Sequence, residues 1–257
     1  MPQLYWQAGQ KERLESISKP EWEDTACWVL RSGNRTILVD TGYDTEEAAR
    51  RGRPILCHPV KAIEALGLTP DDVNDVVITH LHYDHAGTLG SFPRATFHLQ
   101  PAEMAYATGP CMCEDVLRKP FTGSHICDAV TAVFSGRVRF NDKDDAVADG
   151  VTVHCVGGHS KGLQVVRVKT ASGWMCLASD ASHYYENFIT RTPFPIVVDV
   201  EEMLHGYDRI QSLASSNEMV IPGHDPLVTT LYPPFGTSGF VWRLDGGPTA
   251  SLPDRFT

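Results

Sequence analysis

The segment THLHYDHAG, residues 79–87, decides how this chain is interpreted. It places three histidines and one aspartate within six positions, directly after the apolar run DVVIT at 75–79, in a chain that contains only 11 histidines. Imidazole and carboxylate groups together form the usual ligand set for zinc and similar divalent ions. A histidine-rich surface turn is the alternative interpretation, and the rest of the chain has to decide between the two.

Composition indicates a globular protein. The chain has 257 residues, of which 42% are hydrophobic and 21% are charged, so it can bury a sizeable core in one large domain or two small ones. No apolar run approaches the length of a membrane span, and the first residues show no basic start followed by an apolar stretch. We therefore expect a cytoplasmic protein with no membrane partner.

Charge and cysteine content narrow the range of partners. The chain has 22 basic and 32 acidic residues, a net charge of −10, which makes the phosphate backbone of a nucleic acid a poor partner. The seven cysteines are an odd number, and in an intracellular protein we expect them as reduced thiols. The charge balance therefore argues against a nucleic acid as partner.

The pattern along the chain predicts strands on both sides of a helical middle. Residues 26–42 predict a β-hairpin with a Ser-Gly turn, and residues 200–216 predict a helix with one apolar face. Residues 101–138 are irregular and partly helical, as expected for an insertion near a substrate pocket. Further strands are predicted at 75–79, 95–100, 151–159, 163–170, 174–180 and 218–225, and further helices at 59–67 and from 69.

Four of the predicted strands end in a residue that can bind a metal ion. Loops at strand ends are where a rigid scaffold places functional side chains. His80 and His82, two apart in an extended chain, point the same way, and Asp84 and His85 follow across a turn, where they can address a second ion. One histidine at a strand end is more often structural, but this conjunction favours a dinuclear metal site. The four residues at the strand ends are His80, His159, Asp180 and His224.

This ordered set of residues resembles the metallo-β-lactamase superfamily, as does LVDTG at 38–42. The resemblance implies an α+β fold, an αββα sandwich of two mixed sheets flanked by helices, as a single domain over residues 1–257. It also implies two divalent ions, with zinc expected and iron, cobalt or manganese as alternatives. By the same resemblance, one ion is held by His80, His82 and His159, the other by Asp84, His85 and His224, and Asp180 bridges them.

The chemistry of such a site is hydrolysis. A water shared by two divalent ions loses a proton near neutral pH and becomes a hydroxide nucleophile. Either Asp84 or a metal-bound water can return a proton to the leaving oxygen. The segments 157–164, 179–188 and 222–228 resemble the N-acyl-homoserine lactonases, the quorum-quenching branch of the superfamily. We therefore expect opening of an N-acyl-homoserine lactone or a related lactone. A homodimer is expected from the resemblance alone.

The chain departs from that branch at one position. Where the branch has Asp-Ala-Ser followed by a catalytic tyrosine, this chain has His183 and then Tyr184. Either side chain could donate a hydrogen bond to the lactone carbonyl or its oxyanion. The alternative is that His183 faces solvent and Tyr184 packs. The predicted catalytic residues are therefore Asp84, His183 and Tyr184.

Two other functions stay open at this point. One is a metal-dependent thioesterase or aryl esterase with glyoxalase II-like chemistry, because membership of a superfamily does not fix the substrate. The other, from a different class, is a metal-binding protein without turnover. Four side chains of the 101–138 segment either line an acyl pocket or merely cover the sheet, namely Met104, Tyr106, Met112 and Phe121.

Overall fold

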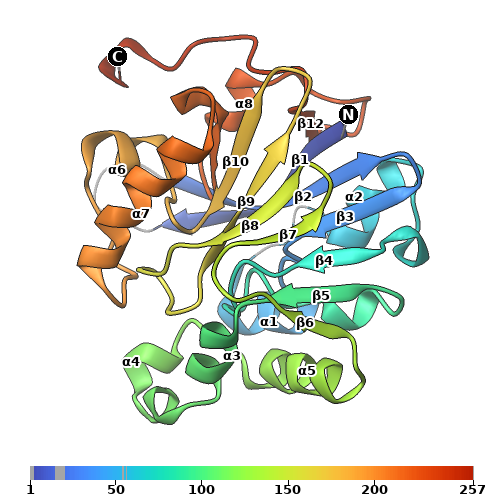
Figure 1. Ribbon diagram of the computed structural model, residues 1–257, viewed down its shortest axis with the longest axis vertical. Helices are drawn as coiled ribbons and strands as arrows, with labels where there is room; N and C mark the ends of the chain where they lie inside the picture. The colour runs from blue at the N-terminus through green and yellow to red at the C-terminus, as the bar shows by residue number, and fades with distance from the viewer. Residues whose placement is uncertain (1–2, 15–20, 54, 56, 257) are drawn as a thin grey trace.

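The computed structural model describes residues 3–14, 21–53, 55 and 57–256. Two β-sheets pack against each other, and helices lie on the outer sides of both (Figure 1). The predicted αββα sandwich of two mixed sheets flanked by helices is confirmed. Among the described residues, no helix is both long enough and apolar enough to cross a bilayer.

The first sheet contains seven strands within the described residues and is mixed. Pairing is antiparallel from β12 to β3 and parallel from β3 to β6. The predicted hairpin is confirmed as β2 and β3, but its turn is Gly33-Asn34 rather than Ser-Gly. Gly33 has a φ of 58°, which suits glycine at the first central position of a tight hairpin turn. The spatial order is β12 (Val241–Arg243), β1 (Gln3–Leu14), β2 (Glu21–Ser32), β3 (Arg35–Val39), β4 (Asp75–Val77), β5 (Thr96–Leu99) and β6 (Val138–Phe140).

The second sheet contains five strands in the described part of the chain. Its strands pair antiparallel from β7 to β10, and β11 joins β10 in parallel. Because β10 and β11 are parallel neighbours, their carboxyl ends lie at the same edge of the sheet. The order is β11 (Val220–Pro222), β10 (Trp174–Ser179), β9 (Gln164–Lys169), β8 (Val151–Cys155) and β7 (Asp145–Ala148).

Side-chain alternation divides the core into two layers. Trp28 and Leu30 of β2 belong to the cluster between the sheets, where they join Val153 and Val166 of the second sheet. Val29, which lies between them in sequence, belongs instead to the cluster on the outer side of the first sheet. Successive side chains of a strand point to opposite faces, so one strand contributes to both layers.

Helices cover the two outer faces. In Figure 1, α6 and α7 lie on one side of the sheets, and α2 lies on the other. The amphipathic helix predicted at 200–216 is α7, which buries Met203, Tyr207 and Ile210 against the second sheet. The helices are α1 (Thr45–Arg51), α2 (Pro59–Ala65), α3 (Pro101–Ala107), α4 (Asp115–Arg118), α5 (Gly123–Phe134), α6 (Tyr185–Thr190), α7 (Val200–Leu213) and α8 (Val228–Leu231).

Short 3-10 turns fill several connections. The helix predicted from residue 69 is wrong in extent, because the structure has only the turn η1 (Pro70–Asp72) there. Asp72 accepts hydrogen bonds from the backbone nitrogen and hydroxyl of Thr69, which closes the turn, and the chain then extends into β4. The remaining turns are η2 (Leu89–Ser91), η3 (Pro110–Cys113), η4 (Asn217–Met219) and η5 (Asp254–Phe256).

Candidate metal centre

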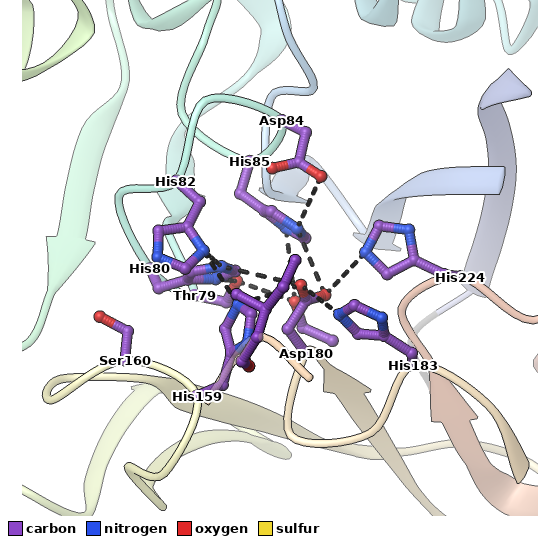
Figure 2. A network of polar contacts seen from close by, with 12 residues as sticks. Thr79, His80, His82, Asp84, His85, His159, Ser160, Asp180, His183 and His224 are labelled. Carbon is purple, nitrogen blue, oxygen red and sulfur yellow. Dashed lines mark hydrogen bonds and ion pairs between the residues drawn. The ribbon is translucent and has the colours of Figure 1, made fainter. Parts of the chain in front are cut away.

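The seven residues predicted as ligands lie together at one edge of the sandwich (Figure 2). The loop after β4 carries four of them, and the loops after β8, β10 and β11 carry one each. The site therefore draws its side chains from both sheets. All seven are buried: His80, His82, Asp84, His85, His159, Asp180 and His224.

Three imidazoles form the first group. Nε2 of His80 lies 3.0 Å and Nε2 of His159 lies 2.9 Å from Nδ1 of His82. Three ring nitrogens this close can all reach a single small cation placed between them. This is the group that the sequence assigned to one ion.

Asp84, His85 and His224 form the second group, with ligand atoms within 4.8 Å of one another. Oδ2 of Asp84 lies 3.7 Å from Nε2 of His85. Two imidazoles and one carboxylate are a ligand set found with zinc and with other first-row divalent metals. This group matches the set assigned to the second ion.

The carboxylate of Asp180 lies between the two groups, as Figure 2 shows. Its Oδ2 lies 3.3 Å from Nε2 of His159, on the side of the first group. Its Oδ1 lies 3.3 Å from Nε2 of His85 and 3.1 Å from Nε2 of His224, on the side of the second. The carboxylate of Asp180 therefore faces both groups and could help to hold a cation in either.

Two buried polar atoms support occupation of the site by cations. Among the described residues, Nε2 of His85 and Oδ1 of Asp180 have no hydrogen-bond partner of good geometry, although both are shielded from water. Buried polar atoms are normally satisfied, and exceptions require an explanation such as an ion. Divalent cations between the two groups would satisfy both atoms, and the donors present fit them.

Burial keeps the first group in the form that binds metal. It lowers the pKa of His80 and His82 well below the usual value and that of His159 to about 4, with repulsion from neighbouring imidazoles adding to the effect. These rings are therefore neutral at pH 7, as ligation requires.

Of the other four predicted ligands, His85 and Asp180 have pKa values shifted against the effect of burial, in opposite directions. Burial would lower the pKa of His85, but the carboxylates of Asp180, Asp84 and Asp40 outweigh it and raise the pKa well above the usual value. Burial would raise the pKa of Asp180, but His224, His85 and His183 outweigh it and hold the pKa well below its usual range. Without cations, the second group therefore retains a proton that metal binding must displace.

Asp40 orients one of the ligands. Its Oδ2 lies 2.8 Å from Nδ1 of His85, and its two oxygens accept from the backbone nitrogen and the hydroxyl of Thr79, each at 2.8 Å. A proton held on Nδ1 leaves Nε2 of His85 bare toward the site. This role of Asp40 was not predicted, although Asp40 belongs to the LVDTG segment at 38–42. Asp40 follows β3 directly, so the strand-end pattern that revealed the ligands was also its signal.

Glu103 joins two of the ligand-bearing loops. Its buried carboxylate accepts from the nitrogen of Leu81 at 2.9 Å, from the hydroxyl of Ser160 at 2.6 Å and from the nitrogen of Gly162 at 2.9 Å. A Cβ at position 162 would come within 2.1 Å of the backbone nitrogen of Glu103, so only glycine fits this approach. Glu103 was missed because nothing in the 101–138 segment marks it.

The other predicted catalytic residues lie at different distances from the centre. Nε2 of His183 lies 3.1 Å from Oδ2 of Asp180, and its ring stacks on Phe194 with ring centres 3.6 Å apart. His183 is buried and lines the pocket beside the site. Tyr184 precedes α6 as its N-cap, and it is not among the described residues that line this pocket.

The pocket has a volume of about 340 Å³ and reaches the ligand cluster. Its wall includes Asp84 and His183 together with apolar residues such as Val116 and Ile196. Of the four side chains of the 101–138 segment considered for an acyl pocket, Tyr106 alone is among the described lining residues, and Phe121 instead packs against the ring of His82. A volume of this order suits a small molecule.

Residues 20–230 match the family model described as the metallo-beta-lactamase superfamily. The chain belongs to this superfamily. The predicted family and fold are therefore confirmed, and the likeness in sequence covers the whole ligand set.

Several relatives and solved structures are similar to the chain. An N-acyl homoserine lactonase of Bacillus thuringiensis is 27% identical over 225 residues, covering 81% of this chain and 82% of that protein. A probable metallo-hydrolase of Mycobacterium tuberculosis is 29% identical over 204 residues, covering 72% of this chain and 66% of its own length, just under two thirds. The crystal structure of a quorum-quenching N-acyl homoserine lactone lactonase has a TM-score of 0.73 at 25% identity, covering 88% of this chain and 93% of that one. Lactonases and metallo-hydrolases among the relatives support the prediction of a metal-dependent hydrolase.

Proposed function

We propose that this protein is a dinuclear metal-dependent hydrolase that opens a lactone ring, with an N-acyl-homoserine lactone or a related lactone as substrate. The observation that carries the proposal is the position of Asp180, whose two oxygens face two separate groups of ligands beside a small-molecule pocket. Similarity to the N-acyl homoserine lactonase of Bacillus thuringiensis supports a lactone as substrate.

In the proposed reaction, some residues of the site hold the cations and others transfer protons. Two divalent cations at the centre, with zinc expected, would supply an acidified water and an electrophile for the ester carbonyl. Asp84 lies at the pocket wall, where its carboxylate is positioned to take a proton from the attacking water and pass it to the leaving oxygen. Opening the ring then leaves a carboxylate and a hydroxyl group on the same product.

His183 has the position for stabilising charge on the substrate. Its ring lies in the pocket wall, held by stacking on Phe194, and its N–H can be directed at the developing oxyanion. Because His183 also lies within 4.8 Å of ligand atoms of His159 and Asp180, direct metal binding is the competing role. Tyr184 is the second candidate for the hydrogen bond.

Proton release with the zinc-loaded protein tests the proposed function. The substrates are short-chain and long-chain N-acyl-homoserine lactones and γ-butyrolactone, and the paired variants are Asp84→Asn and His183→Phe. We expect ring opening by the wild type, a loss of at least about a hundredfold in kcat for Asp84→Asn, and about tenfold to a thousandfold for His183→Phe. Elemental analysis of His183→Phe separates its roles, because loss of metal would make His183 a ligand.

The alternative function is a thioesterase or aryl esterase of the same superfamily. The observation that favours it is His183, which stands where the lactonase branch has its tyrosine. Faster turnover of thioesters than of every lactone would establish the alternative, and no turnover of any ester by metal-replete protein would favour a binding protein. A cytoplasmic location and a homodimer stay predictions.

A further inference from the structure

The charged residues of the pocket wall fall into two classes. Among the described lining residues, the only carboxylates are Asp84 and Asp180, and both are candidate ligands. Apart from histidines, the other charged side chains among the described lining residues are all cations: Arg51, Arg53 and Lys119. This concentration of positive charge stands out in a chain whose net charge is −10.

Arg51 is fixed in place by three contacts. Its guanidinium stacks over the ring of Tyr83 at 3.8 Å, donates to the carbonyl oxygen of Lys119 at 3.0 Å and forms an ion pair with Glu47. Arg50 pairs with the same carboxylate, so two guanidiniums share one negative charge. Burial alone would raise the pKa of Glu47, but the bonds from Arg50 and Arg51 lower it to about 2, and this group of three keeps one positive charge at neutral pH.

Arg53 and Lys119 extend the same wall. The guanidinium of Arg53 lies 5.3 Å from the centre of the Tyr83 ring, so Tyr83 has two guanidiniums near it. Lys119 is exposed and directly follows α4, where its backbone is held by the bond from Arg51. We call Arg51, Arg53 and Lys119 the cationic wall.

The cationic wall is attached to the metal-binding loop. Tyr83 stands between His82 and Asp84 in that loop, and its nitrogen donates to the carbonyl of Pro120 at 2.9 Å. The guanidiniums stacked near its ring therefore keep a fixed place relative to the ligands. A substrate whose ester group sits at the centre would meet the cationic wall with another part of its structure.

We infer that the pocket takes a small lactone or ester that carries a second, anionic group, a carboxylate or a phosphate, and that the cationic wall binds this group. The inference rests on the proposed hydrolytic function and specifies its substrate class. Guanidinium groups suit both anions because their planar array of donors matches two oxygens at once. The pocket volume of about 340 Å³ favours a small molecule over a nucleic acid as the source of the anion.

Matched pairs of substrates test the inference. One pair is γ-butyrolactone γ-carboxylate and its neutral carboxamide, and the other is γ-hydroxymethyl-γ-butyrolactone and its phosphate ester. For each pair, the ratio of kcat/KM for the charged substrate to that for the neutral one is measured at low and high salt. We expect the wild type to favour the charged member of at least one pair, and added salt to reduce this preference. The pair with the larger ratio identifies the anion.

Variants assign the preference to the wall. Lys119→Met should lower the ratio about fivefold, the upper range for one exposed ion pair, and Arg53→Met should lower it at least as much. Arg50→Met is the matched control, because Arg50 binds the same Glu47 as Arg51 but is not among the described residues lining this pocket. Equal ratios in the wild type and Lys119→Met would overturn the inference, as would a neutral preference in both pairs. The negative charge of Asp84 favours the charged form of Arg53 and opposes the lowering of its pKa by burial, so the two side chains interact. An equal loss on charged and neutral substrates in Arg53→Met would therefore assign Arg53 to positioning Asp84 and remove it from the cationic wall.

A binding measurement keeps the inference testable if no lactone is opened. Failure to open any lactone would contradict the proposed function. The cationic wall can still be tested with α-hydroxyglutarate, the dicarboxylate that ring opening of the carboxylated lactone would yield. Calorimetry on the zinc-loaded protein should show about fivefold weaker binding to Lys119→Met than to Arg50→Met. Equal affinities would overturn the cationic wall on its own.

Discussion

Replacing Asp40 with asparagine should weaken metal binding although Asp40 is not itself a ligand. Its carboxylate lies 2.8 Å from Nδ1 of His85 and accepts two further hydrogen bonds at 2.8 Å from Thr79. Asparagine offers one oxygen in place of two and turns an NH₂ donor toward another donor. One charge-assisted bond at a buried site contributes about 1.5–3 kcal/mol, so Asp40→Asn should lose about tenfold to a hundredfold in metal affinity.

The loss should arise from the tautomer of His85. With Asp40 present, the proton stays on Nδ1 and Nε2 faces the cation. Without the carboxylate, a proton on Nε2 competes with metal binding. The assay is competition between the protein and a chromogenic chelator for zinc, with one or two equivalents of metal so that the weaker site is resolved.

Asp75→Asn is the matched control. Asp75 is also a buried aspartate paired with a histidine, since its Oδ1 lies 2.9 Å from Nε2 of His98, but neither residue is among the described ligand candidates. Both variants should lose thermal stability, and only Asp40→Asn should lose zinc affinity. Zinc affinity within twofold of wild type in Asp40→Asn, or equal losses in the two variants, would refute the role given to Asp40.

Three further outcomes are expected. Asp180→Ala should release zinc, seen by elemental analysis, and lower the thermal midpoint of the zinc-loaded protein toward that of the metal-free wild type. Glu103→Gln should reduce stability by about 1–3 kcal/mol in urea titrations and raise protease cleavage within the loops of Leu81 and Ser160, because a buried donor loses its charged acceptor. The free energy of unfolding of the metal-free protein should fall as pH falls from about 6.5 to about 4, because His159 has a pKa of about 4 in the folded protein and about 6.5 in the unfolded chain, which therefore takes up the proton first. In His159→Gln, the free energy of unfolding measured by urea titration should fall by up to about 3 kcal/mol less over that interval.

The residues with metal-binding chemistry could be predicted because their signal is local. A buried strand followed by histidine or aspartate is visible in any short window, and it occurs at His80, His159, Asp180 and His224. The two sheets were predictable for the same reason, since apolar runs of strand length bounded by turns recur along the chain. The extent of the helix expected from residue 69 was not predictable, because a proline followed by two acidic residues is as compatible with a single 3-10 turn as with the start of a helix.

The residues that hold the ligands in place, Asp40 and Glu103, could not be predicted because their hydrogen-bond partners are distant in sequence. Asp40 is 45 residues from His85, and Glu103 is 57 residues from Ser160. No periodicity connects such positions, and a carboxylate within a short helix is usually a solvated surface group. The cationic wall was hidden in the same way, since the end of α1 and the residues after α4 are brought together by stacking on Tyr83 and by the hydrogen bond from Arg51 to Lys119, which are 68 residues apart.

The order of the strands along the chain has a consequence for biosynthesis. The four candidate ligands that follow β4 of the first sheet have all been synthesised once translation reaches His85. The last candidate ligand of the second sheet, His224, is made only after β11, and the edge strand β12 of the first sheet is made later still. A nascent chain therefore carries four exposed metal-binding side chains before the three that must join them have been made. Ions captured by this early segment would be held loosely and exchanged freely. The metal that the folded protein retains would then be selected only once His224 has joined the site, when the geometry of the closed sandwich can discriminate among the ions present in the cell.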